Sequence, residues 1–310
     1  MSSQHLKLIA IGLVVLLLLW GGSELLSHGS DSLAGSLALP ALSPDSVDTI
    51  SVIKGADSIV LVNRPPAGWT VNGHRTAPDA VSDLLKAIGD SVHPELVAQD
   101  RSSFARLGVD SAGGRWLRVH RRRGQPVALI AGGRGSDFAS MYLRRPGDPH
   151  VYLWRGRLPS LLDRPADAWR DKRIATLPVD SIVGIDVVRG KDRYSVARAK
   201  RQWTLNGAAT DSAAQARYLD RLKTISAAGF ATPKEVDSTR AARPTRRLTV
   251  RGLHGVMLSL TFDSTATGFV VRRLAGTAAE GAEGASVYRM NSWDVDGVTP
   301  ASRSLLAPKQ

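Results

Sequence analysis

Hydrophobic and polar residues alternate along most of the chain after residue 46, which predicts β-strands with one buried face. The alternation is clear in Thr49–Ile53 and Ser58–Val62, and it resumes at Trp69 after Pro65-Pro66. The tight-turn dipeptide Asn72-Gly73 follows this third segment. Later segments of the same kind predict strands at Trp116–His120, Pro126–Ala131, Met141–Arg144, Val151–Trp154, Arg247–Arg251, Val256–Phe262, Phe269–Arg273 and Val287–Met290.

A helical spacing of apolar residues interrupts the strand pattern in each half of the chain. The first helix is predicted from one apolar face, formed by Val81, Leu84, Leu85 and Ile88. Thr76 and Asp79 have the spacing of a capping box at its start, and Gly89 suits its end. The second helix is predicted from a comparable face, formed by Tyr218, Leu219, Leu222 and Ile225.

The same order of motifs occurs twice, which predicts two copies of one domain. Trp69-Thr70-Val71-Asn72-Gly73 returns as Trp203-Thr204-Leu205-Asn206-Gly207, and Leu117–Val119 returns as Leu248–Val250. We therefore expect an α+β fold with two tandem homologous domains, residues 47–173 and 179–298. Each should be a mostly antiparallel sheet with one main packed helix. Residues 299–310 are expected to form a flexible tail.

The apolar run Leu8–Trp20 predicts a transmembrane helix within residues 1–26. Its strictly apolar part also has the length of a secretory signal, so a cleaved signal peptide remains an alternative. Lys7 precedes the run, which places the N-terminus in the cytoplasm and the bulk of the chain on the periplasmic side of the inner membrane, as a single-pass protein. Residues 27–46 are rich in Ser, Gly, Ala, Leu and Pro and predict a linker.

Charge points to an anionic partner, and the absence of cysteine excludes disulfides and thiolate chemistry. The formal net charge is +13, which attracts polyanions. A solvated surface is the favoured explanation of the basic clusters, since runs of charge usually serve solubility. Nucleic acid fits the charge but not the expected location. The candidate surface for an anionic partner is formed by Arg121, Arg122, Arg123, Arg144, Arg145, Arg272 and Arg273.

Local motifs for catalysis, metal binding or cofactor binding do not emerge from the sequence. Gly132–Ser136 follows a predicted strand, but a strand-like segment comes next, so a hairpin turn is favoured over a phosphate loop. No histidine lies about three to five positions from another, as a local zinc motif would require. Trp69 and Trp203 could stack on a ligand, but their equivalent positions in the two copies favour packing in the core.

The motifs resemble, in their order, a bacterial family catalogued as domain of unknown function number 4340. Besides the N-terminal anchor and the opening Val-Asp-x-Ile strand, the resemblance rests on Gly68–Val71, Phe104–Asp110, Met141–Arg144, Val151–Leu153 and Trp169–Arg173. It covers about residues 45–298. The second copy departs most at Ser238–Pro244, where Phe104–Asp110 should recur. The resemblance implies a role beside ABC-2-type or gliding-motility-type ABC transporters, and it supplies no catalytic residues.

Three functions follow, from different classes. The favoured one is a non-enzymatic, extracytoplasmic accessory or scaffold protein of an ABC-2-type or related envelope transporter, with a membrane transporter as partner and no cofactor. The alternative is a module that binds an anionic envelope polymer or anionic lipid. An exported hydrolase is least favoured, because active sites need convergent titratable groups that the sequence does not reveal.

Overall fold

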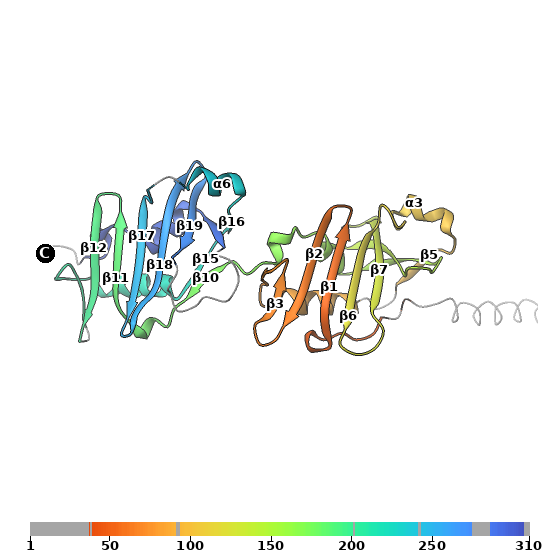
Figure 1. Cartoon of the computed structure of the whole chain (residues 1–310), viewed down its shortest axis with the longest axis horizontal. Coiled ribbons are helices and arrows are strands. Elements are labelled where there is room, and N and C mark those ends of the chain that lie inside the picture. The colour runs from red at the N-terminus through yellow and green to blue at the C-terminus, as the bar shows by residue number, and fades with distance from the viewer. Residues whose placement is uncertain are drawn as a thin grey trace, which may run out of the picture. The chain divides into compact units, whose positions relative to one another are not determined.

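The computed structural model describes residue 37 and residues 39–90, 94–200, 202–240, 243–274 and 286–306. These residues form two nine-stranded antiparallel sheets and a few short helices (Figure 1). The chain divides into two compact units: the residues up to Val60 with Val81–Arg164, and Leu61–Ala80 with the residues from Pro165 onward. The predicted membrane segment lies outside the described residues, and no helix within them is long and apolar enough to cross a membrane.

The first sheet has the strand order β4-β3-β2-β1-β6-β7-β8-β9-β5. Its central strands bury alternate residues, as the sequence predicts; β1, for example, buries Ile50 and Val52, and also Val47 on the far side of a β-bulge. The strands are β1 Val47–Lys54, β2 Asp57–Arg64, β3 Gly68–Val71, β4 His74–Arg75, β5 Glu95–Ala98, β6 Arg115–Arg121, β7 Val127–Arg134, β8 Ser140–Arg144 and β9 Val151–Arg155.

The second sheet has the order β14-β13-β12-β11-β17-β18-β19-β20-β16, which is the same order counted from the start of its own strands. Pairing registers also agree: Arg115 pairs with Ala131 in the first sheet, and Arg246 pairs with Phe262 in the second. The strands are β11 Ile182–Arg189, β12 Asp192–Ala199, β13 Gln202–Leu205, β14 Ala208–Ala209, β16 Gly229–Phe230, β17 Arg246–Gly252, β18 Gly255–Thr265, β19 Gly268–Arg273 and β20 Val287–Met290.

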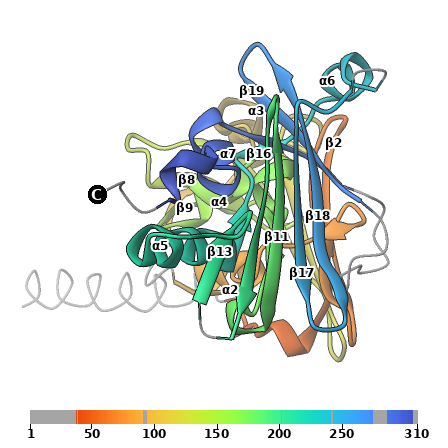
Figure 2. The same ribbon diagram turned by 90° about the vertical axis from the view of Figure 1, so that its left-hand side faces the viewer.

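Helices occupy matching places in the two strand orders. One follows β4 or β14, one lies between β5 and β6 or between β16 and β17, and one follows β9 or β20. In the second sheet, α5 and α7 lie on the same side of β11, β17 and β18 (Figure 2). The helices are α2 Ala80–Gly89, α3 Phe104–Leu107, α4 Leu158–Leu162, α5 Ser212–Lys223, α6 Pro233–Ser238 and α7 Ser292–Val298.

Two details of the predicted helices are wrong. Thr76 does not cap α2, because it lies before the helix in an isolated β-bridge with Arg170. Ile225 is not on the face of α5; it lies in β15 (Thr224–Ser226), which pairs with β10 (Arg173–Thr176) as a separate two-stranded sheet. The cap of α5 is Asp211, whose side chain accepts a hydrogen bond from Ala214 N at 2.7 Å.

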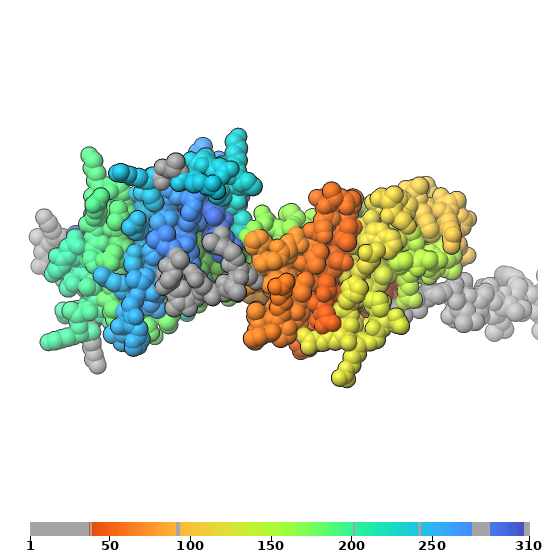
Figure 3. Space-filling view, in the orientation of Figure 1, coloured from red at the N-terminus to blue at the C-terminus, as the bar shows by residue number. Residues whose placement is uncertain are grey.

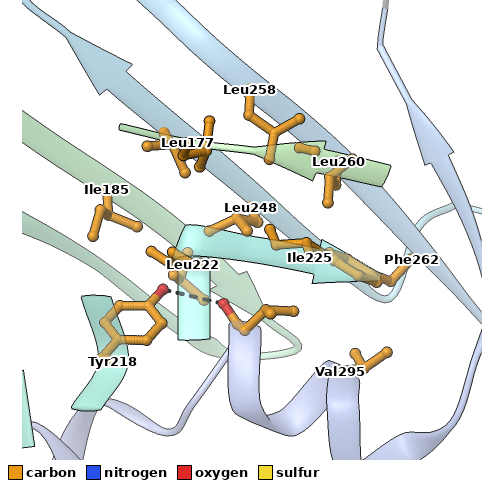
Figure 4. Close-up of a cluster of buried hydrophobic side chains, with 14 of the residues drawn as sticks. Leu177, Ile185, Tyr218, Leu222, Ile225, Leu248, Leu258, Leu260, Phe262 and Val295 are labelled. Atoms are coloured by element: carbon orange, nitrogen blue, oxygen red, sulfur yellow. Dashed lines mark hydrogen bonds between the residues drawn. The ribbon is translucent and has the colours of Figure 1, made fainter. Parts of the chain in front are cut away.

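The core of the second sheet lies between its strands and helices α5 and α7. Leu222, Leu248, Leu258, Leu260 and Phe262 are fully buried there and face one another (Figure 4). The buried hydroxyl of Tyr218 donates to Val298 O at 3.1 Å, which satisfies the one polar atom that this tyrosine brings into the core. Burial raises the pKa of Tyr218, so its hydroxyl stays neutral.

The predicted tail is folded as far as the structure describes it. Leu305 is buried in the core of the second sheet, and Leu306 forms a bridge with Thr210. Tyr194 donates from its hydroxyl to Pro300 O at 2.6 Å. The fold therefore continues through Leu306, and the rest of the predicted tail lies outside the described residues.

Trp69 and Trp203 occupy equivalent positions but are only half-buried. Trp203 packs against the core of the second sheet, with the guanidinium of Arg198 5.9 Å from its ring centroid. The prediction that these tryptophans pack in the core is thus supported for Trp203, which lies at the margin of the core and not at its centre.

Candidate functional site

The seven arginines of the predicted anionic-partner surface fall into different environments. Arg121, Arg122 and Arg123 lie on the hairpin between β6 and β7, and Arg145 is exposed after β8. Arg273 is half-exposed and donates to Ile174 O at 3.4 Å. The other two, Arg144 and Arg272, donate hydrogen bonds to other segments of the protein.

Arg144 is 4% exposed and holds the segment Phe104–Asp110 against the first sheet. Its Nε donates to Val109 O at 2.6 Å, and its guanidinium lies 4.1 Å from the ring centroid of Phe104. Burial and the nearby charge of Arg101 lower the pKa of Arg144. Because no large part of this side chain meets solvent, Arg144 is unavailable to an external anion.

Arg272 does the equivalent work in the second sheet. The pairs Leu143–Tyr152 and Val271–Tyr288 match in register, so Arg272 follows Val271 as Arg144 follows Leu143. Arg272 Nη2 donates to Val236 O at 3.1 Å and to Thr239 Oγ1 at 2.7 Å, at and just beyond α6. The segment at the short helix before β6 or β17 is therefore held by an arginine at the same position of each sheet.

A second arginine contact is also duplicated. Arg115, the first residue of β6, contacts Asp163 Oδ1 at 2.5 Å and donates to Leu162 O at 2.7 Å, just after α4. Arg134 binds the other oxygen of Asp163. Burial raises the pKa of Asp163, but the hydrogen bonds and charges of the two arginines outweigh it and hold that pKa below its ordinary value.

In the second sheet the corresponding pair is Arg246 and Asp296. Arg246, the first residue of β17, contacts Asp296 Oδ1 at 2.5 Å and Thr299 Oγ1 at 3.0 Å, at the end of α7. Arg189 Nη2 reaches the same carboxylate oxygen at 3.1 Å. These contacts were not predicted from the sequence, although Arg115 and Arg246 have the same spacing as the matched Leu117 and Leu248.

The Trp169–Arg173 motif lies in the second unit, with Trp169 and Asp171 buried. Trp169 is 0% exposed, and its carbonyl accepts from Ala77 N at 2.8 Å. The Asp171 side chain is 2% exposed and is bound by Arg75 at 3.0 Å and Arg173 at 2.8 Å. Burial raises the pKa of Asp171, but the hydrogen bonds from Arg173 and the charges of both arginines hold it below its ordinary value.

Gly132 and Gly133 lie inside β7, so the predicted hairpin turn over Gly132–Ser136 is wrong for its first residues. A Cβ on Gly132 would lie 2.3 Å from Leu107 O and 2.6 Å from a Val109 methyl. The glycine is needed because the backbone after α3 passes directly over the strand. This close contact accounts for the glycine at 132, so no phosphate site is needed to explain it.

Gly132→Ala should lower the free energy of unfolding by about 1–3 kcal/mol, because the backbone atoms it meets cannot move aside cheaply. Gly133→Ala is the matched control, since its new Cβ would have its nearest neighbour at 3.6 Å. Denaturant unfolding of the two variants measures the difference. Equal stabilities would contradict the close contact.

The open faces of the two sheets differ in chemistry. In the first, Ile53 and its cross-strand partner Trp116 are half-exposed, with Val60 on the neighbouring strand β2. In the second, Arg247 is exposed, and Arg251 pairs with Asp186 at 2.9 Å. The two sheets therefore share their strand order and buried arginine contacts and differ where they meet solvent.

Within the described part of the chain, no group of three or more His, Asp or Glu side chains could hold a metal ion. The carboxylates whose pKa is displaced there are bound by arginine or histidine side chains or by backbone and hydroxyl groups. Their perturbation is explained by folding contacts.

The described residues form two similar nine-stranded antiparallel sheets. A family model described as a domain of unknown function, DUF4340, matches residues 69–244. This match covers more than half of the chain, and the protein belongs to the DUF4340 family. No curated protein and no solved structure matches it.

Proposed function

We propose that this chain is a single-pass, membrane-anchored accessory or scaffold protein of an ABC-2-type or related envelope transporter. Its folded part lies on the extracytoplasmic side and acts by binding, without a cofactor. The family match carries this proposal, because the resemblance of these motifs implies a place beside such transporters.

The repeated architecture supports a binding role. We infer that the two sheets are homologous tandem domains, since strand order, pairing register and two buried arginine contacts recur together. A duplication that keeps its core and changes its exposed faces offers two different contact surfaces on one chain. An apolar face such as that of Ile53 and Trp116 suits a protein partner.

Membrane anchorage rests on the run Leu8–Trp20 and on Lys7 before it. A reporter that is active only outside the cytoplasm, fused after Gln310, should be active in the full chain. A cytoplasmic reporter at the same site should be silent. The reverse pattern would contradict the orientation. Co-purification with a transporter, described at the end of the Discussion, tests the partner.

A further inference from the structure

A basic hairpin stands beside the point where the chain enters the first sheet. Val47, the first residue of β1, pairs with Arg121, and Arg122 N donates to Ser46 O at 2.9 Å. Arg122 and Arg123 are exposed and Arg121 is half-exposed. Figure 3 shows the yellow hairpin between β6 and β7 projecting from the lower edge of its sheet.

At the other end of the same sheet, arginines are neutralised by neighbouring carboxylates. Arg155, the last residue of β9, pairs with Glu95 at 3.1 Å, and Arg157 pairs with Asp90 at 2.9 Å. Arg115 and Arg134 share Asp163, as described above. This end of the sheet therefore carries little net positive charge that could attract an anionic surface.

The hairpin end is less balanced. Arg122 pairs with Asp48 at 3.2 Å, and both side chains remain about half-exposed. Arg121 Nε donates to a backbone carbonyl, Gln125 O, at 2.8 Å. Arg145 is exposed on the loop after β8, where Asp148 is bound by His150 at 2.6 Å. Two further described carboxylates lie near this end: Asp45 is exposed in η1 (Pro44–Ser46), and Asp100 accepts from Ser102 N at the start of η2 (Arg101–Ser103). The three arginines of the hairpin thus outnumber the two carboxylates beside them, Asp45 and Asp48.

We propose that the β6–β7 hairpin contacts anionic lipid headgroups of the membrane that holds the N-terminal apolar segment. This inference rests on the membrane anchor of the proposed function. The exposed guanidinium groups of Arg122 and Arg123, with that of Arg121, can each bind lipid phosphate through more than one N–H donor. An anionic leaflet attracts such charges within about one Debye length of its surface.

The chain connecting the anchor to the hairpin is short enough for this contact. Leu26 and Ser46 are 20 positions apart in the sequence, so this stretch can span at most about 66–72 Å, and Leu37 within it is buried. The hairpin is therefore held at a high effective concentration relative to the bilayer. An acidic partner protein is the other anion that could meet it, and a system of lipid and this chain alone separates the two.

The test uses the full chain in lipid nanodiscs, with one introduced cysteine, since the chain has none of its own. Gln125→Cys places a fluorophore at the hairpin, before β7, and Ser136→Cys places one on the exposed turn after β7. Nanodiscs of phosphatidylcholine alone, or mixed with phosphatidylglycerol, carry an acceptor dye on their headgroups. Energy transfer then reports which end of the sheet lies near the lipid.

We expect strong transfer from position 125 and weaker transfer from position 136, only in discs containing phosphatidylglycerol. The difference should vanish when salt shortens the Debye length to about 3 Å. Arg121→Gln/Arg122→Gln/Arg123→Gln should lower the ratio of docked to undocked molecules by about a hundredfold, at about fivefold for each charge. The charge-matched control Arg193→Gln/Arg198→Gln/Arg247→Gln, at exposed positions of the second sheet, should leave it unchanged.

Equal transfer from both labels, or transfer that the hairpin variant does not reduce, overturns the hairpin proposal and leaves the anchor standing. Failure of the chain to co-elute with nanodiscs overturns the anchor, and the lipid contact falls with it. The hairpin variant changes two exposed side chains and one half-exposed side chain, and matching thermal unfolding of variant and control shows that folding is not the cause.

Discussion

Trp169→Ala should lower the free energy of unfolding by about 3–5 kcal/mol, the usual cost of deleting a fully buried aromatic side chain. Trp169 is 0% exposed and is followed by Asp171, which is bound by Arg75 and Arg173. The Asp171 side chain, two residues on, is only 2% exposed, so the alanine variant would open a cavity in a buried part of the fold. Chemical denaturation monitored by circular dichroism measures the change.

Trp293→Ala is the matched control, because Trp293 is 74% exposed at the start of α7. Its removal should change the free energy of unfolding by less than about 0.5 kcal/mol. A loss at position 293 equal to that at 169 would show that the burial assigned to the Trp169–Arg173 motif does not determine stability.

Arg272→Ala should cost about 3–5 kcal/mol at neutral pH, because it leaves the carboxylate of Asp263 buried without its partner. Asp263 has 4% of its side chain exposed and contacts Arg272 Nη1 at 2.5 Å. Burial already raises the pKa of Asp263, against the opposing charge and hydrogen bond of Arg272. Removing the arginine should raise that pKa further.

The sign of the pH dependence follows from this shift. A carboxyl group with a raised pKa favours the folded state when protonated, and that contribution is lost as the pH rises through the folded pKa. The loss in Arg272→Ala should therefore shrink as the pH falls toward the ordinary range of aspartate. Adding Asp263→Asn should recover part of the stability at neutral pH. A loss independent of pH would point to packing alone.

Strands were predictable where one face is buried and the other is not. The expected Val287–Met290 is β20 as observed, and the other expected strands of both sheets lie within one to three residues of their observed ends. The similarity of the two sheets was predictable because turn dipeptides and core residues recur at similar spacing. Strand order agrees with that expectation in both sheets.

The environment of single residues was not predictable from local pattern. Arg144-Arg145 reads as a surface pair, but the segment after α3 crosses the sheet and covers Arg144 alone. Gly132 has the local pattern of a turn residue, but it is required in β7 because the backbone at Leu107, distant in the sequence, passes too close for a Cβ. Ile225 continues a helical spacing, but pairing with β10 draws it into a strand. Each of these depends on a tertiary contact that sequence spacing does not contain.

The central claim, a binding role beside a transporter, is tested most directly by affinity purification of the full chain from detergent-solubilised membranes. We expect a multi-span permease and its ATPase to be recovered with the chain in fixed ratio. A variant carrying a charged residue at Ile53, half-exposed on the face of the first sheet opposite Ile50 and Val52, should lose them while staying folded. Recovery of the chain alone, or of an anionic polymer in place of membrane proteins, would contradict the account.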